Sequence, residues 1–465
     1  MEIPSATVKI VLDKVVNFIH EHPTTTKVIR LAALITGVGL LISNPFQSPF
    51  FVKAICGTML ALTSSISFFV LDLLVPPHHD MKNHPFKEGA CLGGKLYYEN
   101  DVPILELDAD NPAQAGFAHG YLCGESIGIL ARRFGLVLHT IARQPRASDL
   151  PKTLAAIRAK IPPEYLLEME GMVKGYNQWI SEQKVTTHPK LTVDDALLFH
   201  LVPDSVHFSP GEYEGKKQHQ FIPVPVVGCT SLVEKDDEGH FVLDRNMDWP
   251  TFGEAGKRSF VIHRKHGNGA HSTVEVGVPG VVGTVTGMND QGLALAMNVC
   301  EGKTNEIRGM PASLYNRMIL ERCSTAQQVE ETVGERAPLG PYHLTIAGPD
   351  RAESIHFYQL PDNNHAIRIS GGQCLATLNW RYSPQPHISL HNDKAREAQL
   401  AQFFKNREGK PLAEALALPE VNNWLTAHRV HMKPAAQELS VAFDNAFAGK
   451  VPLHKIDVRR LFAAG

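Results

Sequence analysis

Residues 228–249 read GCTSLVEKDDEGHFVLDRNMDW, and this stretch decides the fold. A polar, glycine-containing segment at 234–239 separates two runs typical of β-strands, and this pattern predicts a β-hairpin. The centre of the turn is predicted near Asp237, with Cys229 eight residues before it and Arg245 eight residues after it. An antiparallel hairpin would place these two side chains opposite or nearly opposite each other, with Cβ atoms about 5 Å apart.

The hairpin is therefore predicted to gather a thiol, a guanidinium and a carboxylate. An adjacent cation such as Arg245 favours the thiolate, which is the nucleophilic form of cysteine. If the chain is cut before Cys229, the freed α-amine titrates near ~7.7–8.0 and can act as the base at neutral pH. Asp248 follows the second strand and would hold that amine. From the residues alone, a small buried cysteine and a surface Arg–Asp pair stay an alternative.

The Cys-Thr-Ser-Leu-Val run, followed by Gly-His-Phe-Val-Leu-Asp-Arg-Asn-Met-Asp-Trp, resembles the nucleophile hairpin of the acid ceramidase and N-acylethanolamine acid amidase group. This group belongs to the choloylglycine hydrolase and penicillin-acyltransferase-like superfamily of N-terminal-nucleophile (Ntn) hydrolases. Further segments between about residues 85 and 400 resemble the group and occur in the right order. They lie at 102–107, 116–120, 168–171, 280–289, 292–298, 314–333, 342–348, 376–380 and 393–396.

The resemblance implies an α+β fold, the four-layer αββα Ntn-hydrolase sandwich, with Cys229 at the start of a central strand. It also implies that Asn298 and Asn379 donate hydrogen bonds to the oxyanion of the tetrahedral intermediate, because acyl transfer needs such donors. Arg396 corresponds loosely to a late arginine of the group. The alternative for Asn298 is a turn former after a strand, and that for Asn379 is a satisfied polar residue beside Trp380; we favour the functional role for both. We expect His119 to be structural.

The function implied by the resemblance is a self-cleaving cysteine amidohydrolase, cut between Gly228 and Cys229. It would cleave a linear, non-peptide C–N amide bond of an N-acyl lipid, such as a ceramide or an N-acylethanolamine, through an acyl-enzyme on Cys229. One alternative is a small-molecule N-acyltransferase or amidase of the penicillin-acyltransferase or bile-salt-hydrolase type. A second, of another class, is a non-catalytic, membrane-anchored binding protein on an Ntn scaffold.

The first part of the chain, 1–80, is predicted to be a membrane anchor. The run at 54–71 carries no charge and has about the minimum length that spans the hydrocarbon core. A weaker apolar run at 28–43 precedes it, so that residues 28–75 are expected to form a helical hairpin in the membrane. With two spans, the positive-inside tendency leaves the catalytic domain cytoplasmic; with one span it lies on the far side. Two buried core helices are the alternative.

The rest of the chain is divided at the predicted cut into a pro-region or α-subunit part, 81–228, and a catalytic β-subunit part, 229–465. The stretch 97–108 is predicted to be a strand, because apolar residues of strand type dominate it. Helices are predicted at 163–179 and 312–333, where apolar residues recur with a helical period.

Composition excludes several other classes. The formal net charge is -3 over 465 residues, and no Lys/Arg run resembles a nucleic-acid footprint, so we expect no nucleic-acid partner. The seven cysteines are scattered without metal-type spacing, which argues against a disulfide framework. The His- and Asp-containing linker at 76–85 is more typical of a solvated segment than of a metal site. We therefore expect neither a metal nor a cofactor, and the oligomeric state is left open.

Overall fold

The computed structural model describes the greater part of the chain beyond residue 80. The described residues are 81–82, 85–132, 150–201, 203–204, 228–249, 253–300, 309–335, 338–359, 364–370, 374–379, 393–423, 425–444 and 448–463. Across those ranges, no helix combines the length and apolar composition that a membrane crossing requires. The predicted membrane hairpin at 28–75 lies outside the described residues.

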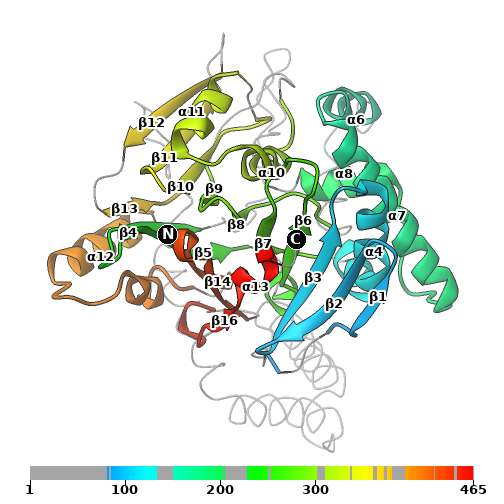
Figure 1. The fold of residues 1–465 in the computed structure, drawn as a ribbon, viewed down its shortest axis with the longest axis horizontal. Coiled ribbons are helices and arrows are strands. Elements are labelled where there is room, and N and C mark those ends of the chain that lie inside the picture. The colour runs from blue at the N-terminus through cyan, green and yellow to red at the C-terminus, as the bar shows by residue number, and fades with distance from the viewer. Residues whose placement is uncertain are drawn as a thin grey trace, which may run out of the picture. The chain divides into compact units, whose positions relative to one another are not determined.

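Two β-sheets form the centre of the unit that spans residues 80–465 (Figure 1). The larger sheet has the order β1 (Gly89–Cys91), β2 (Gly94–Glu99), β3 (Val102–Asp108), β6 (Phe260–Lys265), β7 (Thr273–Gly277), β8 (Thr286–Asn289), β9 (Ala294–Val299), β10 (Tyr342–Ala347), β11 (Ala352–Gln359) and β12 (Asn364–Ser370). The smaller sheet has the order β13 (Cys374–Thr377), β4 (Thr230–Lys235), β5 (Phe241–Asp248), β14 (Thr426–Lys433), β15 (Glu438–Phe443) and β16 (His454–Ile456).

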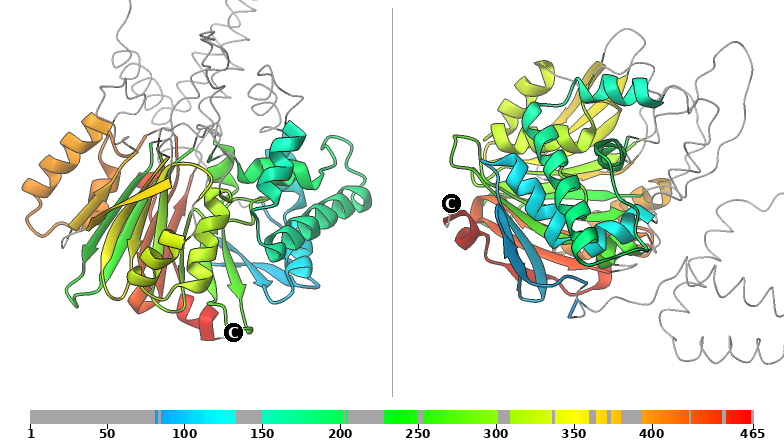
Figure 2. Two further views of the ribbon diagram at one scale, coloured as in Figure 1. Left: turned by 90° about the horizontal axis from the view of Figure 1, so that it is seen from above. Right: turned by 90° about the vertical axis from the view of Figure 1, so that its right-hand side faces the viewer.

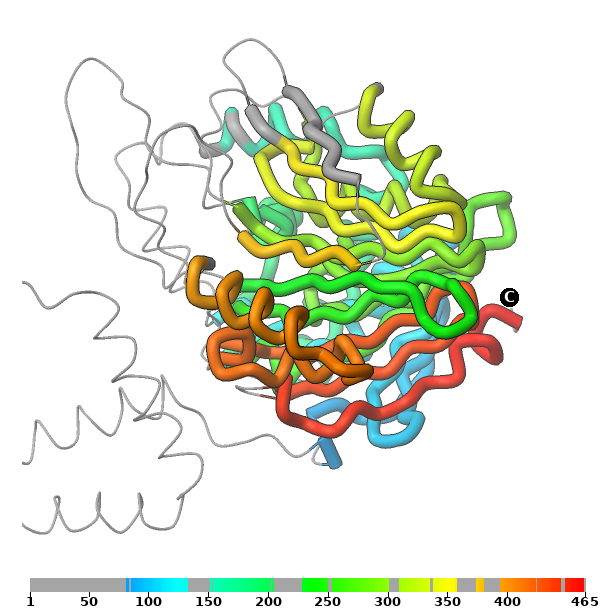
Figure 3. The backbone as a smooth tube through the Cα atoms, turned by 90° about the vertical axis from the view of Figure 1, so that its left-hand side faces the viewer, coloured from blue at the N-terminus to red at the C-terminus, as the bar shows by residue number. Residues whose placement is uncertain are grey.

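Helices cover the outer faces of both sheets, which gives four layers (Figure 2). Those packed against the larger sheet are α4 (Pro112–Leu122), α6 (Leu150–Arg158), α7 (Pro163–Glu182), α8 (Val193–His200), α10 (Ala312–Arg322) and α11 (Ala326–Glu335). The smaller sheet is covered by α12 (Asp393–Lys405) and the 3₁₀ segment η2 (Leu412–Ala417), which lie over the β4–β5 hairpin in Figure 3. The remaining short helical segments are α9 (Glu254–Lys257), η3 (Pro434–Ala436), η4 (Ala448–Lys450) and α13 (Val458–Ala463).

Side-chain alternation along the strands explains why the sheets stack. Successive residues of a strand point to opposite faces. On β4, Val233 joins the apolar core between the two sheets, whereas Leu232 joins the core beneath α12 and η2. On β3, Ile104 enters the core between the sheets and Leu105 enters the core under α4 and α7. The predicted α+β sandwich is therefore confirmed.

The part before the predicted cut is not a separate domain. Strand β3 pairs in parallel with β6, so that β1, β2 and β3 extend the larger sheet. Helices α4 and α7 cross at very short distance, because glycines lie at the crossing: Gly116 and Gly120 on α4, Gly171 and Gly175 on α7. A Cβ on Gly116 would lie 1.9 Å from the carbonyl oxygen of Glu168.

Two predicted elements are each split in two. The stretch 97–108 is not one strand, because Asn100 and Asp101 take the left-handed conformation, with φ of 49° and 66°, and turn the chain between β2 and β3. The stretch 312–333 is not one helix, because Cys323 is extended (φ −107°, ψ 135°) and ends α10 before α11 begins. Helix α7 covers the predicted 163–179 and continues to Glu182.

Candidate active site

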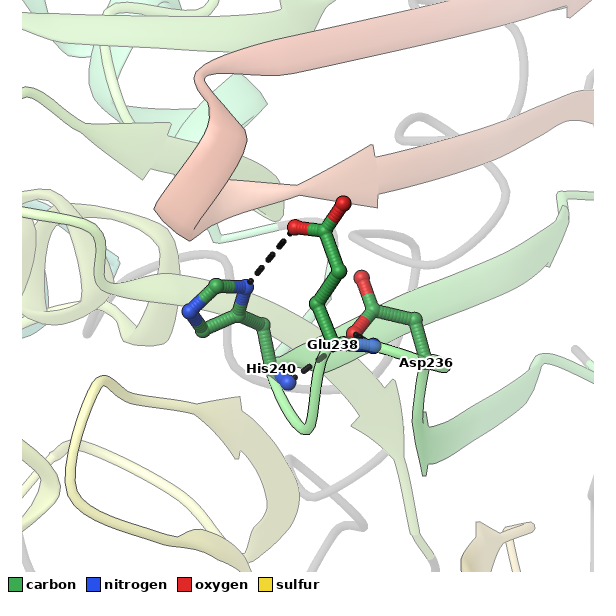
Figure 4. A group of neighbouring side chains, drawn as sticks. All are labelled: Asp236, Glu238 and His240. Carbon is green, nitrogen blue, oxygen red and sulfur yellow. Dashed lines mark hydrogen bonds and ion pairs between the residues drawn. The ribbon is translucent and has the colours of Figure 1, made fainter.

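A single carboxylate closes the turn of the β4–β5 hairpin (Figure 4). Oδ1 of Asp236 accepts the N–H groups of Glu238 at 3.0 Å and His240 at 2.9 Å. These three side chains each bring one possible metal-ligand atom to within 4.8 Å of the others, but Glu238 and His240 are exposed. The contacts among these residues are those of a turn, so we assign the group to hairpin closure.

The register of the hairpin differs slightly from the prediction. Lys235 pairs with Phe241 and Ser231 pairs with Arg245, so the turn is centred one residue later than predicted. Arg245 therefore faces Ser231 directly and is a diagonal neighbour of Cys229. Its long side chain spans the diagonal, and Nη2 lies 3.6 Å from Sγ of Cys229. The predicted meeting of thiol and guanidinium is observed, although not as a directly opposed pair.

Arg245 is buried, and its hydrogen-bond acceptors are neutral. Nη1 donates to the carbonyl oxygen of Val285 and to the hydroxyl of Thr286, and Nη2 donates to the carbonyl oxygen of Met297. Burial lowers the pKa of Arg245, while Cys229 and Asp248 act in the opposite direction. Among the described residues, no carboxylate lies within ion-pair distance of this guanidinium. The guanidinium therefore presents its charge to the Cys229 sulfur.

Asp248 faces the peptide that precedes the cysteine. Its carboxylate accepts the Thr426 hydroxyl at 2.6 Å and the side-chain N–H of Asn423. A Cβ built on Gly228 would lie 3.0 Å from Oδ2 of Asp248, so the carboxylate adjoins the residue before the predicted cut. The backbone carbonyl of Asp248 also accepts the thiol of Cys229 at 3.7 Å. Asp248 is therefore placed to hold an amine at the start of residue 229.

Helix α12 brings Arg396 to the same peptide. Nη1 donates to the carbonyl oxygen of Gly228 and, at 2.7 Å, to that of Cys229. Nη2 donates to Oδ1 of Asn379 at 3.1 Å. A guanidinium on the Gly228 carbonyl polarises it and would stabilise an oxyanion formed there. The loose sequence alignment of Arg396 thus leads to a residue in direct contact with the predicted cleavage point.

The two asparagines also lie at the site. Nδ2 of Asn298 donates to the carbonyl oxygens of Cys229 at 3.2 Å and Thr377 at 2.8 Å, and its Oδ1 accepts the Ser231 hydroxyl at 2.7 Å. Nδ2 of Asn379 donates to the carbonyl oxygen of Val299 at 2.6 Å. Both amides therefore bind main-chain carbonyls of the uncut chain, and their role as oxyanion donors stays a prediction.

Apolar side chains surround the thiol on its remaining sides. Cys229 shares one buried cluster with residues from both sides of the predicted cut, with Trp249 and Val285 packed against it. The other members of this cluster are Leu130, Met247, Ala255, Val278 and Ala427. The predicted nucleophile therefore lies in largely apolar surroundings.

One family model matches part of the chain. The family described as acyl-coenzyme A:6-aminopenicillanic acid acyl-transferase matches residues 233–377. This match, over less than a third of the chain, supports the resemblance to the penicillin-acyltransferase-like group of Ntn hydrolases. No curated protein sequence matches it at a significant level.

Solved structures similar to this chain include an N-acylethanolamine-hydrolyzing acid amidase ortholog from Caenorhabditis elegans. The two share 17% identity at a TM-score of 0.37, over 44% of this chain and 93% of that chain. A conjugated bile acid hydrolase from Clostridium perfringens shares 13% identity at a TM-score of 0.34, over 50% of this chain and 93% of that one. A variant of the same hydrolase gives 14% identity at a TM-score of 0.38.

Sequence reasoning missed the residues that hold the side chains of this candidate site in place. Asn423 and Thr426 bind the Asp248 carboxylate, yet they lie 175 and 178 residues further along the chain. Ser231 orients Asn298 from within the quoted hairpin itself. The hydroxyl of Ser231, at a strand position expected to be buried, was the one available signal, because a buried hydroxyl requires a partner.

Proposed function

We propose that this chain is an amidohydrolase that cuts itself before Cys229 and then hydrolyses a linear, non-peptide amide. The observation that carries the proposal is the uncut Gly228–Cys229 peptide, which lies among a thiol, two guanidinium groups and a carboxylate. Sγ of Cys229 lies beside Arg245, Arg396 binds the carbonyl to be attacked, and the Asp248 carboxylate adjoins Gly228.

The cut is an acyl shift followed by hydrolysis. Sγ of Cys229 attacks the Gly228 carbonyl carbon, and Arg396 stabilises the oxyanion. The C–N bond then breaks, the nitrogen takes the proton given up by the thiol, and a thioester forms between Gly228 and Sγ. Water hydrolyses the thioester, which frees the thiol, the α-amine and the Gly228 carboxylate. The products have 228 residues and 465 − 228 = 237 residues.

Turnover of substrate uses the groups that the cut has released. The α-amine of Cys229 takes the thiol proton, and the sulfur attacks the substrate carbonyl. The amine passes the proton to the leaving amine of the substrate, and an acyl thioester remains on the sulfur. Water then releases the carboxylic acid. Asp248 keeps the α-amine oriented, and Asn298, Asn379 and Arg396 are the proposed donors around the oxyanion.

The proposed substrate is an N-acyl lipid. Support comes from the apolar cluster around the thiol, and the anchor predicted at 28–75 would bring the site to a lipid surface. A small-molecule amidase or acyltransferase is the second candidate, because the matching family is described as an acyltransferase. Assays of the cut protein on an N-acylethanolamine, a ceramide and a short N-acyl amino acid separate the two. Release of fatty acid from the lipids alone supports the first, and turnover of the short amide alone overturns it.

Gly228→Ala should slow the cut. A Cβ at this position would lie 3.0 Å from Oδ2 of Asp248 and 3.6 Å from Nη1 of Arg396, so the carbonyl would be moved from its place. Displacement of a reacting group by about 1 Å can cost about 10²-fold in rate. The rate is followed by separating the chains at intervals after synthesis. Gly334→Ala, where an added Cβ meets nothing within 4 Å, is the control, and equal rates in both variants would contradict this geometry.

A further inference from the structure

The loop 278–285, between β7 and β8, forms one wall of the site. Val278 and Val285 belong to or pack against the apolar cluster that contains Cys229. The carbonyl oxygen of Val285 accepts Nη1 of Arg245. Any movement of this loop would therefore change both the packing around the thiol and the position of the guanidinium beside it.

The loop is held by its own peptide groups. The carbonyl oxygen of Val282 accepts Nη2 of Arg264 at 3.1 Å and Nη1 of Arg317 at 2.9 Å. The N–H of Thr284 donates to the carbonyl oxygen of Ser313 at 2.8 Å. Gly283 is required there, because a Cβ would lie 2.7 Å from the backbone of Ser313. Arg264, Ser313 and Arg317, which make these contacts, lie after the predicted cut, as the loop itself does.

Two further contacts come from the part before the predicted cut. Nε2 of His119, on α4, accepts the N–H of Gly280 at 3.1 Å. Nε2 of His200, on α8, accepts the N–H of Val282 at 2.8 Å. Nδ1 of His200 lies 2.7 Å from the carbonyl oxygen of Ala196, so Nδ1 carries the proton and Nε2 is left as an acceptor. Both imidazoles are fully buried.

We propose that His119 and His200 are positioning residues, which hold the loop 278–285 from the N-terminal part and thereby keep the Val285 carbonyl on Arg245. The proposal rests on the proposed function, since it assumes that Cys229 is the nucleophile. It makes the N-terminal part a component of the active site after the cut, and not only a leader to it. Neither histidine contacts the reacting atoms.

The surroundings keep both imidazoles neutral. The charged groups facing them are Glu168 on α7, Arg264 on β6 and Arg317 on α10, and Glu168 is paired with the two arginines at 2.5 and 2.6 Å. Burial lowers the pKa of His119 to about 3 and that of His200 to about 4; the two arginines act in the same direction and Glu168 in the opposite one. A protonated imidazole has no acceptor nitrogen, so acid releases the loop.

The sign of the pH dependence follows from these values. An unfolded histidine titrates near ~6.5, above both folded-state pKa values. Between pH ~6.5 and about 4 the unfolded chain therefore binds protons that the folded chain does not. Stability from the two neutral imidazoles is complete above pH ~6.5 and declines as the pH falls to about 4.

The test compares His200→Gln with His200→Asn in the full chain, shown to be cut by its mass. A glutamine amide reaches about as far as Nε2 and can accept from Val282, but it does not titrate. An asparagine amide can replace Nδ1 toward Ala196 and is too short to reach Val282. The readouts at neutral pH are the rate at which iodoacetamide alkylates Cys229, resolved by peptide mass spectrometry, and kcat per titrated Cys229 thiol.

The expected result is a loss of about tenfold or more in both rates for His200→Asn, with KM nearly unchanged, and near wild-type rates for His200→Gln. Equal alkylation in His200→Asn and wild type overturns the proposal. The alkylation assay needs no substrate, so it tests this proposal separately from the proposed function. If alkylation is slow in His200→Asn and the wild type hydrolyses no amide, this proposal stands and the proposed function is overturned.

If His200→Asn does not fold, the double variant His119→Gln with His200→Gln decides. It should keep the neutral-pH alkylation rate of Cys229 and show a smaller fall in melting temperature than wild type between pH ~6.5 and 4, where other buried histidines such as His356 also contribute. A double variant whose melting temperature falls with acid as steeply as that of wild type contradicts neutral acceptors at these positions.

Discussion

Cys229→Ala is expected to give a single chain of 465 residues that hydrolyses no amide. The change removes the sulfur that attacks the Gly228 carbonyl, and it removes the nucleophile for every later turnover. Without the cut there is also no α-amine to act as a base. Loss of the nucleophile in comparable triads costs about 10⁶-fold in kcat, so no turnover should be measurable. Intact mass and fatty-acid release on the same preparation check both parts of the result.

The matched control is Cys323→Ala. Cys323 is as buried as Cys229, but it packs in the core beneath the helices of the larger sheet. Its loss should lower stability slightly and leave the cut and the activity intact. Hydrolysis by Cys229→Ala at the wild-type rate would remove the cysteine from the mechanism altogether.

Arg245→Lys should lose about 10²–10³-fold in kcat/KM. The guanidinium reaches the Cys229 sulfur and three oxygen acceptors with a planar fork, and an ammonium cannot reproduce that fork. Carbonyl oxygens of Val285 and Met297 would lose their buried donors, at a cost of about 1–3 kcal/mol each in the free energy of unfolding. Kinetics on protein shown to be cut, together with denaturant unfolding, separate the two effects.

Arg429→Lys serves as the control for that experiment. Arg429 is on β14 of the same sheet and donates to the carbonyl oxygens of Gly449 and Ala413, each at 3.0 Å. Burial lowers its pKa as it does for Arg245. Arg429→Lys should therefore lose stability without losing kcat. A similar loss of kcat in both variants would show that the effect of Arg245→Lys is a general effect of a disturbed sheet.

The hairpin could be predicted because its partners are close in sequence. Cys229, Arg245 and Asp248 lie within 20 residues of one another, so strand pairing alone brings them together. The error of one residue in the turn centre has a local cause. Asp236 accepts the N–H groups of Glu238 and His240, and this side-chain contact moves the turn toward the second strand.

The contributions of distant elements could not be predicted from spacing. Thr426 reaches Asp248 from another strand of the smaller sheet, and His200 reaches Val282 from a helix on the far face of the larger sheet. These contacts form only when the layers stack on one another, and no local sequence pattern predicts how the layers stack. Arg396 was identified through the resemblance alone, and its bond to the Gly228 carbonyl required the packing of α12 on the smaller sheet.

The mass of the purified wild-type protein, measured together with its amide-hydrolysing activity, tests the central claim most directly. Active protein should consist of two chains, and the second should begin at Cys229. Before any other processing, the two chains should have 228 and 237 residues. N-terminal sequencing of the second chain should read Cys-Thr-Ser-Leu-Val. Active protein that consists of one uncut chain, or whose new N-terminus lies at another residue, would contradict the account.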